Sequence, residues 1–277
     1  MAVNDILLTL TSYPEPTPVS VIKEAIAVAS SLGAHIAALS CEMHVEVPGH
    51  FMAGSIVGLP GIIAGETAKS RKNAQALITA FESDAAKAGV SFESIRQTCK
   101  PDERAELLVE YARLRDLTIM PESNDRWYAE AVIFGSGRPT LILPQNPRSG
   151  PFALGTVVVA WDFSRAAARA VSDSLPLLER AATVRVVSVL NEKHLDRKHS
   201  AEELSKNLSR HGIDVVLDRV DAGGRAVGAV LENYVASHAA DLLVMGAYGH
   251  SRLREFVLGG ATRSLLSKPS LPILFSH

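Results

Sequence analysis

The feature that most constrains the fold is an internal repeat, in which apolar strand-like runs alternate with longer helical patterns. The run Asp116-Leu-Thr-Ile-Met120 in the first half matches Asp241-Leu-Leu-Val-Met245 in the second. Gly89 and Gly212 each end the helical pattern that precedes the third strand of a half. A repeat of this length is domain-sized. Strands separated by helices imply parallel sheets with right-handed crossovers, so we expect an α/β chain in two similar units.

The apolar periodicity predicts the individual elements. In the first half we expect strands over 6–10, 35–41, 90–98, 116–120 and 140–143, with helices over 21–32, 67–88 and 103–114, the last capped by Asp102. In the second half we expect strands over 156–160, 184–190, 213–220, 241–245 and 271–275, with helices from Ser164, its cap, to about 182 and over 201–211, 225–238 and 261–267.

The repeat predicts two domains, residues 1–144 and 151–277, joined by a polar linker at 145–150 that is rich in helix and strand breakers. The first half is longer by an insertion at about 43–66, whose centre is apolar and glycine-rich. Such a segment is not expected to lie bare in water. It could serve as a lid, as a wall for an apolar ligand or as an interface, and packing within or between chains is the reading we favour.

Composition excludes several classes of function. The 28 basic and 30 acidic residues give a net charge of -2, which argues against a nucleic-acid binder. The most apolar segment, 53–64, is shorter than the roughly 20 residues of a membrane span. Two cysteines, Cys41 and Cys99, give no disulfide framework or zinc spacing, and the N-terminus lacks a leader pattern. We therefore expect a cytoplasmic protein with no membrane or nucleic-acid partner.

A glycine motif follows the fourth strand of the second half. Gly246 and Gly249 close an apolar run, and Gly259 and Gly260 open a helical pattern nine residues later. Glycines here would permit close approach to the backbone and leave the amides at the start of the helix bare. Those amides and the helix dipole favour an anion. The spacing therefore predicts an anion-binding crevice.

In this motif the chain resembles the universal stress proteins, whose ATP-binding signature is Gly-x-x-Gly, nine residues, then Gly-Ser or Gly-Thr. Gly246, Gly249 and Gly259 match it, whereas Gly260 stands where the ATP binders carry a hydroxyl. The resemblance covers nearly the whole chain as a tandem pair. It implies two doubly wound five-stranded parallel-sheet sandwiches of the adenine nucleotide alpha hydrolase-like type, with strand order 3-2-1-4-5. The two fifth strands would pair as a pseudo-dimer, and a homodimer through the fifth strands would follow.

The family's strand order brings the ends of strands 1 and 4 together, where ligands bind in open parallel sheets. The resemblance then assigns ATP, ADP or AMP, with magnesium as a companion, to this set of residues: Ala160, Trp161, Asp162, Val189, Met245, Gly246, Gly249, Arg252, Gly259, Gly260, Ala261 and Thr262. Alternative interpretations stay open. A helix cap could be the only role of Asp162, and Trp161 is expected to belong to the core or to the crevice wall. The side chains of Arg252, Arg254 and Arg263 could be solvated instead of facing phosphates.

The same positions differ in the first half. Pro121 and Glu122 replace the glycine loop, and Thr11-Ser12-Tyr13 replaces the aspartate stretch, so we expect no ATP there. Gly135-Ser136 could hold a small anion, although a turn into the fifth strand is the favoured reading.

Residues that suggest catalysis form no known pattern. Cys41, Glu42, His44, Glu46 and His50 do not have zinc-site spacing, and His250-Ser251 lacks a nucleophile elbow. Neither a Walker loop nor a carboxylate set for magnesium is present. We therefore expect a stress-responsive regulatory protein that binds an adenine nucleotide. The alternatives are a scaffold or small apolar ligand binder of the same fold and, more weakly, a slow ATP hydrolase.

Overall fold

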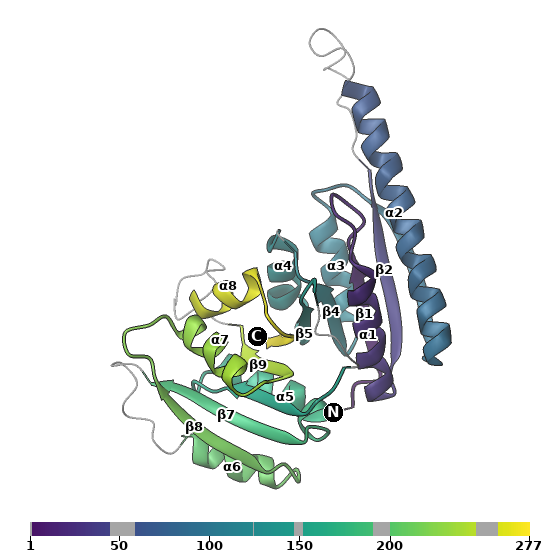
Figure 1. Ribbon diagram of the computed structural model, residues 1–277. Helices are drawn as coiled ribbons and strands as arrows, with labels where there is room; N and C mark the ends of the chain where they lie inside the picture. Colours follow the sequence, from purple (N-terminus) through teal and green to yellow (C-terminus); the bar gives the residue numbers. More distant parts are fainter. Residues whose placement is uncertain (1, 45–58, 124, 147–151, 191–199, 248–259) are drawn as a thin grey trace.

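Ten strands form one continuous sheet in the computed structural model, which describes residues 2–44, 59–123, 125–146, 152–190, 200–247 and 260–277 (Figure 1). The order is β3-β2-β1-β4-β5-β10-β9-β6-β7-β8. The expected order 3-2-1-4-5 is therefore confirmed in the first half, and the second half repeats it in the opposite direction across the sheet. The strands are β1 Asp5–Leu10, β2 His35–Met43, β3 Phe92–Cys99, β4 Leu117–Pro121, β5 Thr140–Leu143, β6 Thr156–Ala160, β7 Thr183–Leu190, β8 Val215–Asp221, β9 Leu242–Gly246 and β10 Ile273–Ser276.

The two halves meet through their fifth strands. β5 and β10 pair antiparallel, with Ile142 opposite Ile273, whereas every other pair in the sheet is parallel. The expected pseudo-dimer pairing is confirmed. β5 also has β4 as a neighbour and β10 has β9, so both edges of each fifth strand are occupied within one chain. A homodimer would therefore need a surface other than the fifth strands.

Helices cover both faces of the sheet. One apolar cluster holds residues of α1 Val19–Leu32, α2 Leu59–Ala88, α5 Arg165–Leu178 and α6 Ser200–Ser209. The second cluster, on the other face, holds residues of α3 Arg104–Arg113, α4 Trp127–Gly135, α7 Val227–Ser237 and α8 Gly260–Ser267. Each core therefore runs through both halves of the chain.

The repeated aspartates have the same structural role in both halves. Asp116 accepts hydrogen bonds from the backbone N–H groups of Asn4 and Asp5, at 2.9 and 3.1 Å. Asp241 accepts one from the N–H of Thr156, at 2.9 Å. Each carboxylate thus ties the start of strand 4 to the start of strand 1, which explains why the sequence repeat includes it.

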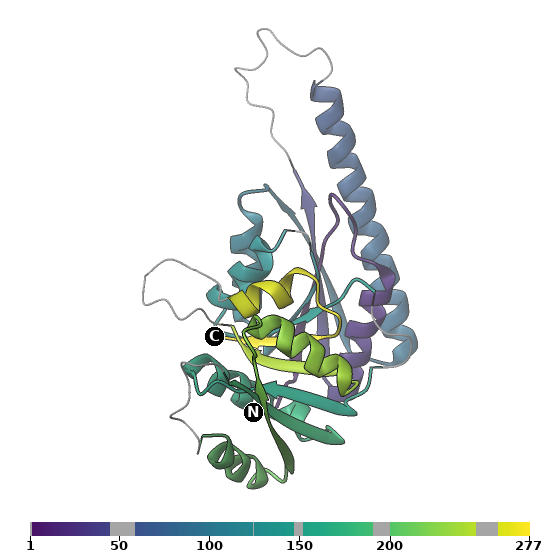
Figure 2. The ribbon, with the colours of Figure 1, turned by 60° about the vertical axis from the view of Figure 1, so that its left-hand side comes forward.

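Two local expectations need correction. α2 begins at Leu59, not at 67, and stands well beyond the end of the sheet (Figures 1 and 2). The insertion expected at about 43–66 therefore partly continues a helix, and its residues 45–58 lie outside the described part of the chain. The predicted cap Asp102 is wrong, because α3 has Glu103 at its N-cap position and no side-chain cap hydrogen bond.

The boundaries of the two domains stay a proposal, since linker residues 147–150 also lie outside the described ranges. Among the described helices none is long and apolar enough to cross a membrane.

Candidate functional site

A crevice is expected where β6 and β9 end side by side. The two strands pair in parallel, with Val157 opposite Leu242 and Val159 opposite Val244, so their carboxyl ends meet at one edge of the sheet. Three of the predicted contact residues, Ala160, Val189 and Met245, belong to one apolar cluster there. The structure therefore places these three residues on one face of the sheet, at the ends of β6, β7 and β9.

Asp162 lies in the turn that starts α5. Its Oδ1 accepts a hydrogen bond from the N–H of Ser164 at 2.9 Å, and the Ser164 hydroxyl caps α5 by accepting from the N–H of Ala167 at 3.0 Å. The expected cap at Ser164 is confirmed. Asp162 itself is exposed, so its carboxylate is open to solvent while it braces the turn.

Phe163, which the sequence did not single out, has a left-handed backbone conformation with φ of 61°. Bulky side chains rarely adopt it, and such outliers concentrate at functional turns. The ring is 51% exposed and makes an edge-on contact with Trp161, with 6.0 Å between the ring centroids. No local signal in the sequence predicts this conformation.

Trp161 belongs to the core, as expected. It is 8% exposed and its indole N–H donates to the Ser200 hydroxyl at 3.3 Å. Its ring therefore packs between β6 and α6, and its backbone N–H donates to the carbonyl of Val187 at 2.9 Å.

Gly246 has a packing role that the sequence did not reveal. A Cβ on this residue would lie 2.5 Å from the backbone nitrogen of Ala167 and 2.8 Å from the Cβ of Ala166. The end of β9 therefore packs directly against the start of α5, which explains the glycine without a ligand.

The predicted phosphate region is only partly described. Gly249, Arg252, Gly259 and also Arg254 lie outside the described residues. α8 begins at Gly260, which is exposed, and a Cβ there would meet nothing within 4 Å. Ala261 is half-buried and Thr262 is buried in the helix, so backbone amides are the groups that the start of α8 can offer an anion.

The register of the sheet defines which residues of the two halves are equivalent. Ile6 pairs with Leu117 as Val157 pairs with Leu242, so Leu10 corresponds to Trp161. The strands predicted over 6–10 and 156–160 would instead have aligned Leu10 with Ala160, one residue earlier. Across the crevice, the first-half residues Thr11, Cys41, Cys99 and Pro121 correspond to Asp162, Val189, Ala222 and Gly246.

The crevice of the first half contains a cavity of about 360 Å³. It lies at the ends of β1 and β4, in the place that the candidate nucleotide site occupies in the second half. Its wall is largely apolar and includes residues from β2, α2, α3 and α4, among them Met43, Ile62, Ile63, Arg104 and Tyr128. Residues of the predicted insertion thus form a wall of this cavity.

Arg104 is the cation of this cavity and is only 7% exposed. One of its terminal nitrogens donates to the Thr11 hydroxyl at 3.0 Å, and the guanidinium lies 4.4 Å from the centroid of the Tyr128 ring. Its Nε has no hydrogen-bond partner among the described residues, while the negative charge of Asp125 acts on the guanidinium. Burial lowers the pKa of this side chain below its ordinary value.

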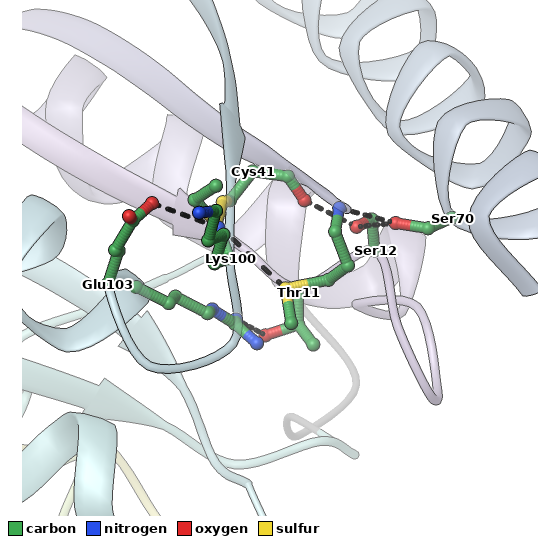
Figure 3. Close-up of a disulfide and its surroundings, with 9 residues drawn as sticks. Thr11, Ser12, Cys41, Ser70, Lys100 and Glu103 are labelled. Carbon is green, nitrogen blue, oxygen red and sulfur yellow. Dashed lines mark hydrogen bonds between the residues drawn. A yellow bond between two sulfur atoms is a disulfide. The ribbon is translucent and has the colours of Figure 1, made fainter. Parts of the chain in front are cut away.

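A disulfide joins Cys41 to Cys99, which corrects the expectation that these two cysteines give no disulfide framework (Figure 3). The two residues are 58 positions apart in sequence, and only the pairing of β2 with β3 brings them together, at a Cα–Cα distance of 6.1 Å. Beside it, the Ser12 hydroxyl donates to the carbonyl of Cys41 at 2.6 Å and lies 2.9 Å from the Ser70 hydroxyl. This buried network fixes the end of β1 against α2.

The other polar candidates of the first half have structural partners. Glu42 forms ion pairs with Arg71 and Arg96, while Glu46 and His50 lie outside the described residues. Gly135 ends α4, and the Ser136 hydroxyl accepts from the N–H of Arg138 at 3.1 Å, as the turn reading expects. The described residues contain no group of three or more potential metal ligands.

Comparison with known proteins relates the second half to a family. Residues 154–277 match the model of the universal stress protein family. Over 51 residues the chain is 47% identical to a universal stress protein of Synechocystis sp., a stretch that spans 18% of the chain and only 17% of that relative.

Solved structures extend the likeness of fold to the whole chain. A universal stress protein from Archaeoglobus fulgidus DSM 4304 superposes with a TM-score of 0.70 at 16% identity, covering 100% of this chain and 99% of the other. A functionally unknown protein from Pseudomonas aeruginosa PAO1 gives 0.60 at 13% identity, covering 99% and 92%. At these identities the likeness concerns the fold alone.

Proposed function

Because the C-terminal half is a universal stress protein domain, we propose that its crevice binds ATP or a related adenine nucleotide. The observation that carries the proposal is the meeting of the ends of β6 and β9, where an exposed Asp162 follows β6 and apolar residues of the same strand ends are packed in one cluster. In this site Asp162 would accept hydrogen bonds from the adenine amine or a ribose hydroxyl, and the first amides of α8 would serve a phosphate.

The proposed role is regulatory. A ligand that binds one conformation better than another shifts the population toward it. A bound nucleotide would join β6, β9 and α8. The two strands are held by the sheet and α8 packs against α7, so occupancy would alter the surface near α8. We propose that this change of surface is what a partner reads under stress.

Ligand extraction and titration test this function. The full chain is purified gently and denatured, and released nucleotide is quantified by chromatography and mass spectrometry, alongside calorimetric titration with ATP. We expect one adenine nucleotide site per chain. Absence of extracted nucleotide together with no heat signal at millimolar ATP would reject the proposal.

The Asp162→Asn variant provides the matched control. It keeps the Oδ1 acceptor that holds the N–H of Ser164 but removes the negative charge of the side chain. We expect weaker ATP binding with an unchanged thermal unfolding temperature. Binding of two nucleotides per chain would instead place a second site in the first half, contrary to the expectation that this half does not bind ATP.

A further inference from the structure

We propose that the cavity of the N-terminal half binds a monocarboxylate with an apolar body, whose carboxylate pairs with Arg104. This site is distinct from the nucleotide crevice proposed above and does not depend on it. The cavity volume of about 360 Å³ lies within the range of about 300–1,000 Å³ that is typical of small-molecule sites.

The argument for a negative ligand group starts from the burial of Arg104. A guanidinium is rarely buried unless it is paired, because removing it from water is costly. Arg104 contacts the neutral hydroxyl of Thr11 and the side chain of Tyr128, and the negative charge of Asp125 acts on it. Its buried Nε is still left without a hydrogen-bond partner among the described residues. The Nε of Arg104 therefore lacks the acceptor that a ligand carboxylate would supply.

The surroundings of Arg104 suit a planar anion. Because the ring of Tyr128 covers a face of the guanidinium, the edge with its N–H groups is the part available for a fork-shaped contact with two oxygens. Thr11 accepts a hydrogen bond from Arg104, so its own hydroxyl proton can be donated to the same ligand group. Arg104 also opens α3, whose N-terminus favours negative charge.

The remaining charges limit the ligand to one negative charge. Glu66 and Asp125 also border the cavity. Glu66 lies beside Tyr13 and raises the pKa of its hydroxyl, and Asp125 accepts from the N–H of Trp127 at 3.1 Å. A triphosphate would be repelled by both carboxylates. A single carboxylate can pair directly with Arg104, and the charge of Glu66 is offset by the Nζ of Lys69 at 3.9 Å.

The body of the ligand must be apolar. Met43 closes the cavity on the side of β2, and Ile62 and Ile63 form its wall on α2. Ile62 is 60% exposed, although a large aliphatic side chain is normally removed from water where packing allows. An aliphatic or aromatic chain lying against α2 would cover it.

The test uses the full chain, stripped of bound lipid, and three probes with the same alkyl chain: decanoate, decanol and decylamine. Calorimetry should show one decanoate per chain, with decanol bound about tenfold more weakly or worse, because a hydrogen bond to a charged group is stronger than one between neutral groups. Decylamine should not bind. ATP should leave the affinity for decanoate unchanged. Equal binding of decanoate and decanol, no binding of decanoate, or competition by ATP would each overturn the proposal.

Two variants keep the proposal testable. Arg104→Met removes the charge and should weaken the binding of decanoate about tenfold while leaving the binding of decanol unaffected. A merely structural role of Arg104 would not produce this difference between the two probes. If this variant does not fold, the exposed Ile62 offers a second route. Ile62→Glu should weaken decanoate more than Ile62→Gln does, since only the first adds a negative charge at the wall. Equal effects of these two variants on the binding of decanoate would contradict the proposal.

Discussion

The two crevices of this chain share one backbone frame and differ in chemistry. At equivalent positions the second half has Asp162, Val189 and Gly246, and the first half has Thr11, Cys41 and Pro121. The first half adds a buried Arg104, whereas α7 of the second half contains no basic residue. One backbone frame thus carries an exposed carboxylate in one half and a buried cation in the other, which teaches that equivalent strand ends of the same fold can present opposite charges.

The disulfide is the largest difference between the halves. Cys41 and Cys99 take the places of Val189 and Ala222, so the first half has a covalent link where the second has two apolar residues. A link that closes a loop of 58 residues is worth about 4 kcal/mol in the chain-entropy description. We expect Cys99→Ser to lower the free energy of unfolding by about that amount in urea denaturation followed by circular dichroism.

The matched control for this prediction is Ala222→Ser at the equivalent position. It places a hydroxyl at a buried site and should cost only about 1 kcal/mol. Adding a reductant to the wild-type protein should reproduce the Cys99→Ser loss. Similar losses for Cys99→Ser and Ala222→Ser would mean that the link does not distinguish the halves.

The second comparison concerns the ends of the fourth strands. Gly246 has no room for a Cβ, because α5 fills that space, whereas its equivalent Pro121 carries a full ring. Gly246→Val should destabilise the protein by about 3 kcal/mol through overpacking. The measurement is urea denaturation followed by the fluorescence of Trp161, after Trp127→Phe has removed the other of the two tryptophans.

A neutral result for Gly246→Val would show that α5 can move away and that the glycine serves a ligand instead. Gly260→Ala serves as the control, since a Cβ at that position meets nothing within 4 Å and the change should not lower stability. Loss of ATP binding in Gly246→Val alone is therefore no evidence for a direct contact with the nucleotide.

The third prediction sharpens the nucleotide proposal by restoring a group that the family signature has and this chain lacks. The open space at Gly260 accepts a hydroxyl-bearing side chain at the start of α8. Gly260→Ser should strengthen ATP binding by about tenfold relative to Gly260→Ala, because a hydrogen bond to a charged phosphate contributes about 1.5–3 kcal/mol. Equal affinities of the two variants in calorimetry would show that the start of α8 does not contact the phosphates.

The sequence predicted the fold well because each half repeats the same local signals. Gly33, Gly89 and Gly212 have φ of 67°, 66° and 75° where the helical patterns end, since glycine adopts this conformation at little cost. Buried parallel strands appear in the sequence as continuous apolar runs, so their positions could be predicted. Their order in the sheet was then predicted from the family resemblance.

The features that the sequence did not predict depend on contacts between distant residues. Cys41 and Cys99 meet only through strand pairing, and the lack of space at Gly246 is set by α5. The burial of Arg104 likewise depends on Thr11 and on Tyr128 of α4. Of the twelve residues proposed for the nucleotide, those in the described part of the chain gather at the ends of β6, β7 and β9 and at the start of α8, and their role stays a prediction.

The smallest expected effect compares α1 with its counterpart α5. The only acidic residue of α5, Asp173, pairs with Arg169 at 2.8 Å, whereas Glu24 of α1 has a buried Oε2 with no partner among the described residues. Burial raises the pKa of Glu24 from its ordinary 4.5 to about 7. The folded protein therefore binds more protons than the unfolded chain between these values, and stability that is present below pH 4.5 is lost as the pH rises toward 7.

Replacement of Glu24 by glutamine should remove this loss. Because Glu24 is only partly buried, water screens its charge, and we expect Glu24→Gln to raise the free energy of unfolding by about 1 kcal/mol at pH 8 and to change it little at pH 4. The measurement is urea denaturation at both pH values, with Asp173→Asn as the control that should give no gain at pH 8. A gain that is the same at both pH values would show that packing of the amide, and not the charge of Glu24, distinguishes α1 from α5.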